Sequence, residues 1–190
     1  MDVLLYLPRY GRRAKRVVWS REGARVIIIL MGVSGVGKTA VGTRLAEVLG
    51  WRFRDADDFH SAENIAKMAA GLPLTDEDRW PWLERLRELI RSALESGEEL
   101  VLACSALRRV YRERLTVDPA RERWVSLWAP REVIAERLAK RRGHYMSPML
   151  LDSQLAILEA ADEALKVEVS ANVDTIVARI LEELGLQPSS

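Results

Sequence analysis

The sequence has almost no cysteine and no long hydrophobic run, and both absences narrow the possible classes of protein. Its single cysteine, Cys104, has no partner for a disulfide within the chain, so nothing in the composition requires an oxidising compartment. No apolar stretch approaches the roughly 20 residues that a membrane-spanning helix needs. We therefore expect a soluble, cytoplasmic protein that does not associate with a membrane.

The chain also lacks an excess of either charge. Lys and Arg number 29 and Asp and Glu number 28, which gives a formal net charge of +1. Because nucleic-acid-binding surfaces are usually strongly basic, this balance argues against a nucleic-acid partner and favours a small molecule. A length of 190 residues suits one buried core and is too short for two ordinary domains. We therefore expect a single domain over residues 25–190.

Basic residues are nevertheless concentrated in residues 1–24. There the charges follow the short apolar patch Val3–Leu7, which is the reverse of the order in a secretory signal. An organelle-targeting peptide is an alternative, because the segment has few acidic residues, although serine is scarce in it. We interpret residues 1–24 as a basic N-terminal extension without a catalytic role.

Hydrophobic patterning predicts strands that alternate with helices. The run Val26–Leu30 is unbroken and mostly β-branched, as expected for a strand buried on both faces of a parallel sheet. Apolar residues recur at helical spacing over residues 39–49. Further strands are predicted at 51–54, 98–104, 124–128 and 165–169, and further helices at 79–96, 106–115, 130–142, 148–159 and 172–184. The pattern predicts an α/β fold, with a five-stranded parallel sheet covered by helices on both faces.

Two details refine this prediction. Thr75 and Asp78 have the spacing of a capping box that starts the helix at residues 79–96, and Pro81 then falls in its first turn. Residues 57–74 and 142–148 are polar, contain glycine and interrupt the alternation, so we expect them to be the mobile segments.

A phosphate-binding loop follows the first predicted strand and precedes a helix. Eight residues satisfy the pattern G-x-x-x-x-G-K-[ST]: Gly32, Val33, Ser34, Gly35, Val36, Gly37, Lys38 and Thr39. Glycines let backbone N–H groups turn towards the phosphates, and the start of a helix adds partial positive charge. Lys38 is expected to reach the β- and γ-phosphates of ATP, and the Thr39 hydroxyl to bind Mg²⁺. A glycine turn without a ligand is the alternative, but the full pattern in this context favours nucleotide binding.

An acidic cluster ends the second predicted strand, where Asp55, Asp57, Asp58 and His60 occur together. Ligands of parallel sheets bind beyond the carboxyl ends of the strands, so these side chains should face the same crevice as the phosphate loop. One Asp is expected to accept a hydroxyl proton and another to hold the hydration shell of the metal. The alternative is that Asp57 and Asp58 cap the next helix and that His60 is solvated.

Several motifs together resemble the gluconokinase family in order and spacing. They are residues 55–60, Asn64 with Lys67-Met68, residues 71–79 with Pro81-Trp82-Leu83, residues 103–109 with Tyr111-Arg112, Glu136-Arg137-Leu138 with Arg141, residues 143–146, Leu150-Leu151, and Ser153-Gln154 with Leu158-Glu159. The resemblance covers about residues 26–180. It implies a nucleoside-monophosphate-kinase-like P-loop fold with sheet order 2-3-1-4-5, ATP-dependent phosphorylation of D-gluconate to 6-phosphogluconate, and a homodimer.

The site residues expected from these arguments fall into three groups. Catalysis is assigned to Lys38, Asp57, Arg137 and Arg141; acceptor binding to Asp57, His60, Lys67, Arg79 and His144; and the metal to Thr39 and Asp55. The resemblance implies the roles of His60 and Arg79, with Lys67 as a second candidate for the acceptor carboxylate. It also implies an acceptor-binding segment at about 57–96 and a lid at about 137–150.

Other side chains near these motifs are expected to be structural or to face the phosphates. Arg137 and Arg141 lie four apart on one predicted helix, so they should share a face, and a solvated basic face is the alternative to a lid. Cys104 is expected in the core, Ser105 near the phosphates, and Trp82 in packing.

Three alternative functions stay open from the sequence. They are another kinase of the same fold, of the shikimate or nucleoside type; a non-catalytic ATP-binding regulatory module; and a nucleic-acid-associated P-loop protein that uses the basic opening segment. A molecular-switch GTPase is disfavoured, because neither an Asp-x-x-Gly after a strand nor an Asn-Lys-x-Asp motif occurs.

Overall fold

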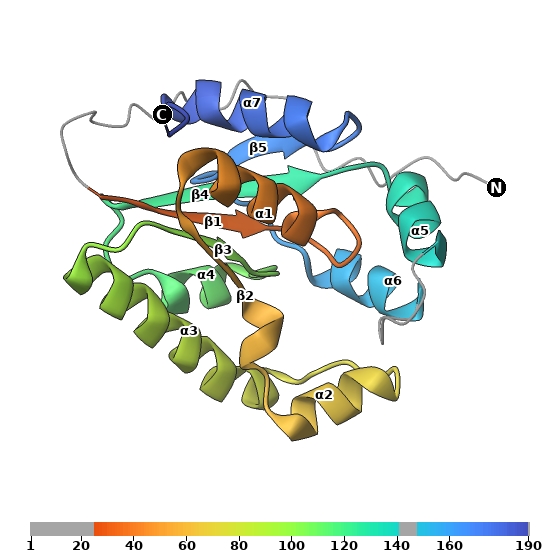
Figure 1. The fold of residues 1–190 in the computed structure, drawn as a ribbon. Coiled ribbons are helices and arrows are strands. Elements are labelled where there is room, and N and C mark those ends of the chain that lie inside the picture. The colour runs from red at the N-terminus through yellow and green to blue at the C-terminus, as the bar shows by residue number, and fades with distance from the viewer. Residues whose placement is uncertain (1–24, 141–147, 190) are drawn as a thin grey trace.

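The computed structural model describes residues 25–140 and 148–189, which form one parallel sheet with helices on both faces (Figure 1). The strands are β1 (Ile27–Met31), β2 (Arg52–Asp55), β3 (Leu100–Ala103), β4 (Glu122–Trp128) and β5 (Leu165–Glu168). The helices are α1 (Lys38–Leu49), the short 3₁₀ helix η1 (Ala56–Phe59), α2 (Ala62–Ala69), α3 (Asp76–Ser96), α4 (Arg109–Leu115), α5 (Arg131–Lys140), α6 (Pro148–Ile157) and α7 (Val173–Leu184).

The strand order is β2-β3-β1-β4-β5, and every neighbouring pair is parallel. The predicted five-stranded parallel sheet is thus confirmed, including the order implied by the resemblance. None of the helices in the described part of the chain is both long and apolar enough to cross a bilayer.

The central strand β1 shows why the sheet needs a layer on each face. All five of its residues are buried, and alternate side chains enter different cores. Ile28 and Leu30 pack with α1, α5 and α7, whereas Ile27, Ile29 and Met31 pack with α3 and α4. Figure 1 shows α3 and α4 on the opposite side of the sheet from α1 and α7. The continuous β-branched run of the sequence is the direct consequence of burial on both faces.

Helix α3 begins three residues earlier than predicted. The Asp78 amide donates to Thr75 Oγ1 at 3.3 Å, and Asp78 Oδ2 accepts from the Thr75 amide at 2.9 Å, which completes the capping box and makes Thr75 the N-cap. Pro81 consequently lies inside the helix, in its second turn, so the prediction that it falls in the first turn was wrong.

Two other segments differ from the predicted pattern. Residues 57–74, expected to interrupt the alternation, contain most of η1 and the whole of α2, which Ser61 caps through its side chain. The helix predicted from residue 106 begins at Arg109, because Ala106 adopts a positive φ of 42° that a helix does not allow. The predicted mobile segment 142–148 lies almost wholly outside the described residues.

Candidate active site

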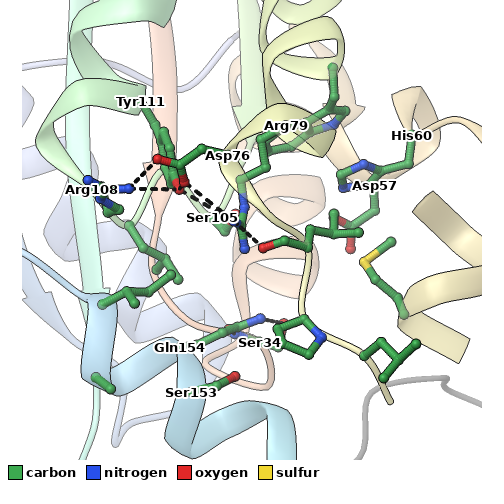
Figure 2. A pocket seen from close by; sticks show the side chains of 18 of the residues that line it. Ser34, Asp57, His60, Asp76, Arg79, Ser105, Arg108, Tyr111, Ser153 and Gln154 are labelled. Atoms are coloured by element: carbon green, nitrogen blue, oxygen red, sulfur yellow. Dashed lines mark hydrogen bonds and ion pairs between the residues drawn. The ribbon is translucent and has the colours of Figure 1, made fainter. Parts of the chain in front are cut away.

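A cavity of about 510 Å³ is lined by residues that follow the strands of the sheet and by residues of α3, α4 and α6 (Figure 2). The phosphate loop contributes Ser34 and Lys38, and the acidic cluster contributes Asp57 and His60. The sequence-based expectation that the two motifs face one crevice is therefore met. Ser105, at the end of β3, also lines it.

The phosphate loop is held in shape by backbone conformations that only glycine adopts easily. Gly32 has φ of 144°, and a Cβ there would lie 2.6 Å from the Leu127 carbonyl oxygen, while Gly37 has φ of 112° and caps α1. The Lys38 ammonium folds back over the loop and donates to the carbonyls of Gly32 at 2.9 Å and Val33 at 3.1 Å. The loop thereby gathers a cation and a helix N-terminus, the groups that bind phosphate.

Thr39 and Asp55 form a pair of hard oxygen donors beside this loop. Thr39 Oγ1 donates to Asp55 Oδ2 at 2.8 Å, and Asp55 Oδ1 accepts from the Asp57 amide at 3.1 Å. Within residues 25–140 and 148–189, no group of three or more His, Cys, Asp or Glu side chains is arranged to hold a metal ion alone. One hydroxyl and one carboxylate fit Mg²⁺, which in phosphoryl-transfer sites takes most of its ligands from water and phosphates.

His60 is a half-buried, neutral member of the cavity wall. Its ring stacks on Trp82 with the centroids 4.4 Å apart, and its Nδ1 is buried without a hydrogen-bond partner in the described structure. The pKa of His60 is lowered from 6.5 to about 4, mainly by burial and also by the charges of Arg79 and Arg85. The alternative that His60 is a solvated surface residue is therefore wrong.

The helix-capping alternative for the acidic cluster is also wrong. The cap of α2 is Ser61, and the cap of η1 is Asp55. Both Asp57 and Asp58 are exposed, but Asp57 lines the cavity and Asp58 does not. Trp82 combines packing with a place on the cavity wall, because it is buried and its Nε1 donates to the Ala56 carbonyl at 2.8 Å.

Four side chains from α3, α4 and the loop before α4 form a second side of the cavity, which we call the arginine wall: Asp76, Arg79, Arg108 and Tyr111 (Figure 2). The Tyr111 hydroxyl donates to Asp76 Oδ1, and Arg108 Nη1 donates to Asp76 Oδ2 at 2.5 Å. The two guanidinium carbons lie 5.5 Å (Arg79) and 5.3 Å (Arg108) from the centre of the Tyr111 ring. The hydrogen bond from Tyr111 and the ion pair with Arg108 lower the pKa of Asp76, which keeps its carboxylate charged.

Lys67 is not brought to this wall. Its ammonium pairs with Asp78 Oδ1 at 2.6 Å, and the neighbouring Asn64 donates from Nδ2 to the Asp78 carbonyl at 2.8 Å, so both link α2 to the start of α3. Lys67 does not line the cavity.

Arg137 is directed at backbone carbonyls. Its Nη1 donates to the Val36 carbonyl at 3.1 Å and its Nη2 to the Val169 carbonyl at 2.5 Å, which fastens α5 to the phosphate loop and to the residue after β5. Arg141 and His144, the other residues assigned to the lid, lie outside the described residues.

Sequence reasoning assigned no role to several residues that the structure places at the cavity. Arg108 and Tyr111 follow β3, and the rule that ligands bind beyond the carboxyl ends of strands would have indicated Arg108. Gln154 on α6 holds the phosphate loop at two points: its Oε1 accepts from the Ser34 amide at 2.7 Å, and its Nε2 donates to Ser34 Oγ at 3.1 Å. No local pattern signals that contact, because it joins residues 120 positions apart.

Cys104 lies in the core, as predicted. It is 1% exposed, and burial raises the pKa of its thiol to about 12, so it is not a nucleophile at neutral pH.

Comparisons with known proteins match a domain family and several gluconokinases. The AAA domain family matches residues 27–164. The gluconokinase of Gluconobacter oxydans (strain 621H) is 44% identical over 158 residues, with 83% of this chain and 88% of that protein covered. The thermosensitive gluconokinase of Escherichia coli (strain K12) is 42% identical over 157 residues, with 82% and 83% covered. The crystal structure of a gluconokinase from Sinorhizobium meliloti 1021 superposes with a TM-score of 0.76 at 40% identity, and covers 85% of this chain and 93% of that one.

Proposed function

The chain belongs to the gluconokinase family, and we propose from this that it transfers the γ-phosphoryl group of ATP to the terminal hydroxyl of D-gluconate, giving ADP and 6-phosphogluconate. One observation carries the proposal beyond family membership. The same cavity is lined by the phosphate-loop lysine and an aspartate, Lys38 and Asp57, and by two guanidiniums, Arg79 and Arg108. A hydroxylated carboxylic acid matches that combination, because its hydroxyl suits the aspartate and the lysine and its carboxylate suits the guanidiniums.

The phosphate loop supplies the donor side of the reaction. The loop amides and the Lys38 ammonium bind the β- and γ-phosphates and stabilise the charge that spreads over the transferred group. Thr39 and Asp55 would hold Mg²⁺, the hydroxyl as a ligand and the carboxylate through the ion's water shell, and the ion would supply positive charge that neutralises the phosphates. Arg137 acts at this side by fixing the loop through the Val36 carbonyl.

Asp57 serves the acceptor side. Its carboxylate accepts a hydrogen bond from the terminal hydroxyl, aims the oxygen at the γ-phosphorus and takes the proton late in the transfer. Arg79 pairs with the carboxylate of gluconate, because a guanidinium offers two parallel N–H donors to a planar anion. Neutral His60 offers hydrogen bonds to the hydroxyl groups between these ends.

A coupled ADP-release assay tests the assignment. The acceptors are gluconate, shikimate, glycerate and a set of nucleosides, each with ATP and Mg²⁺, and we expect turnover with gluconate well above that with the others. Asp57→Asn should lower kcat by roughly 10²–10⁴ because the general base is lost, with KM for ATP unchanged. Asp58→Asn is the matched control, since Asp58 is exposed and lies outside the cavity.

Each outcome of this assay has a definite meaning. Turnover of another acceptor with gluconate inert would move the protein to another kinase class of this fold, and ATP binding without any turnover would make it a regulatory module. Full activity of Asp57→Asn would reject Asp57 as the base.

The remaining expectations concern assembly, location and the ends of the chain. We expect a homodimer, the form that the family resemblance implies, and light scattering of the full chain measures it. We also expect a cytoplasmic protein that binds no nucleic acid. Deleting residues 1–24 should leave kinase activity intact, whereas loss of activity would give that segment a functional role. A lid role for Arg141 and His144 stays a prediction, because they lie outside the described residues.

A further inference from the structure

Arg108 is the one cation of the arginine wall that the sequence analysis left without a role. It sits at the N-cap of α4, and it lines the cavity together with Arg79. It comes from the segment after β3, 29 positions further along the chain than Arg79, so only the fold brings the two guanidiniums to one ring, that of Tyr111.

The contacts of the two arginines with the wall use one edge of each guanidinium. Arg79 reaches the Leu74 carbonyl at 2.5 Å and the Tyr111 hydroxyl at 3.4 Å through Nη1. Arg108 reaches Asp76 Oδ2 at 2.5 Å and the Tyr111 hydroxyl at 3.5 Å, also through Nη1. Among the described side chains, the Nη2 of each makes no hydrogen bond or ion pair. A guanidinium has five N–H donors, so each retains donors for a further anion.

Two carboxylates lie near Arg108, and they have different tasks. Asp76 forms the close ion pair and also accepts from Tyr111, so it fixes the plane of the Arg108 side chain from the side of α3. Glu159 is 3.7 Å from Arg108 Nε, and its other oxygen accepts from the Arg109 amide at 2.5 Å, so it mainly satisfies the start of α4. Of the two, only Asp76 lines the cavity.

We propose that Arg108 is a second acceptor-binding residue, which binds the carboxylate of the acceptor together with Arg79, and that Asp76 is the positioning residue that holds Arg108 for this task. The inference rests on the proposed function and adds to it a second residue for the acceptor carboxylate, which lies at the end opposite to the phosphorylated hydroxyl. Selection of the acid over a neutral polyol then depends on Arg108 as well as on Arg79.

The alternative is that Arg108 only ties α4 to α3 through Asp76. The two readings differ in how loss of Arg108 affects acceptors with and without a carboxylate. A structural tie would affect both acceptors equally. A carboxylate-binding residue affects only the acid, because a neutral polyol of the same chain length has no group for it to bind.

The experiment compares kcat/KM for gluconate and for sorbitol, the neutral polyol, in the full-length enzyme. Arg108→Gln should lower kcat/KM for gluconate roughly 10- to 100-fold, the usual effect of losing a hydrogen bond to a charged group, and change that for sorbitol less than about threefold. Arg108→Lys should fall between, because an ammonium keeps the charge but not the paired donors. Asp76→Asn should raise KM for gluconate several-fold, with kcat and KM for ATP unchanged.

Arg109→Gln is the matched control. Arg109 is the adjacent residue, exposed and paired with Glu113 at 2.7 Å, and it does not line the cavity, so its loss should change neither acceptor. Thermal unfolding of each variant checks that the fold is kept. An equal loss with gluconate and sorbitol, or no loss with either, overturns the inference while leaving the proposed function intact. A wild-type enzyme that does not phosphorylate gluconate overturns the proposed function first, and the inference with it.

Discussion

The two sides of the cavity are built in different ways. The phosphate side is one continuous stretch of eight residues, Gly32 to Thr39, and its chemistry is mostly that of the backbone. The arginine wall is assembled from side chains of α3, α4 and the loop before α4, with Asp76 and Tyr111 35 positions apart in the sequence. Phosphate is recognised by amides and one lysine in many unrelated reactions, whereas the arginine wall, which we propose binds the acceptor, is a network of side chains that tertiary packing brings together.

Gln154 connects the two sides. Its amide holds Ser34 of the phosphate loop at 2.7 and 3.1 Å, and it also lines the cavity with the arginine wall. The phosphate side is therefore not independent of tertiary structure, although its sequence is recognisable without it. The difference between the two sides predicts that a variant at one side changes the binding or turnover of one substrate more than that of the other.

Lys38→Met should have the largest effect of this kind. Removing the ammonium takes away the cation that stabilises the transferring phosphoryl group, and kcat should fall roughly 10²–10³-fold. Gluconate binding, measured by calorimetry without nucleotide, should stay within about threefold of wild type, since the arginine wall is intact. Lys140→Met is the control, because Lys140 is exposed and, among the described residues, pairs with Glu136. Loss of gluconate binding in Lys38→Met would show that the two sides are not separable.

The same contrast explains how much could be predicted from the sequence. The β-branched run of β1 and the glycine-lysine pattern after it are formed by consecutive residues, so both were predictable from the sequence. The spacing of apolar residues likewise identified most helices and strands. The strand order rested on the family resemblance, because hydrophobic period does not say which strands pair. The capping box at the start of α3 was recognised, but the first helical residue was placed three positions too late, because Asp76–Asp78 are polar and precede the apolar stripe.

The arginine wall was only partly predictable for a physical reason. Lys67 and Arg108 are both basic residues near a family motif, and nothing local separates them. In the structure Lys67 pairs with Asp78 and so joins α2 to α3, whereas Arg108, which follows β3, lines the cavity. Which cation meets the acceptor depends on how α2, α3 and α4 pack, and that information is spread over the whole chain.

Arg112→Met should have the next largest effect, on stability. The Arg112 side chain is 3% exposed, pairs with Glu163 at 2.6 Å, and donates to the carbonyls of Ala106, Leu107 and Ala160. These bonds hold the loop that precedes Arg108, including the positive φ of Ala106. Leaving buried carbonyls unsatisfied should cost about 2–4 kcal/mol, a fall in Tm of roughly 5–12 °C.

Arg114→Met is the control for Arg112, because Arg114 is exposed and its ion pair with Glu84 at 2.8 Å should contribute less than about 1 kcal/mol. The fraction of Arg112→Met that stays folded should have a raised KM for gluconate and an unchanged KM for ATP. That result would support the distinction between the two sides of the cavity. A rise in KM for ATP alone would contradict the assignment of Arg112 to the arginine-wall side.

His60 gives the smallest effect and one that depends on pH. Its pKa is lowered from 6.5 in the unfolded chain to about 4 in the folded protein, because burial against Trp82 and the charges of Arg79 and Arg85 disfavour the imidazolium. The unfolded chain therefore binds a proton that the folded protein does not, so stability is full above about pH 6.5 and is lost as pH falls towards 4.

His60→Phe keeps an aromatic ring on Trp82 and cannot titrate. Urea unfolding between pH 7 and 4 should show that wild type loses more stability than His60→Phe, by on the order of 1 kcal/mol after allowance for the partial exposure of the ring. Parallel curves for the two proteins would mean that folding does not lower the pKa of His60, so its imidazole would gain a proton below about pH 6.5 and the neutral hydrogen-bonding role would not hold at acidic pH.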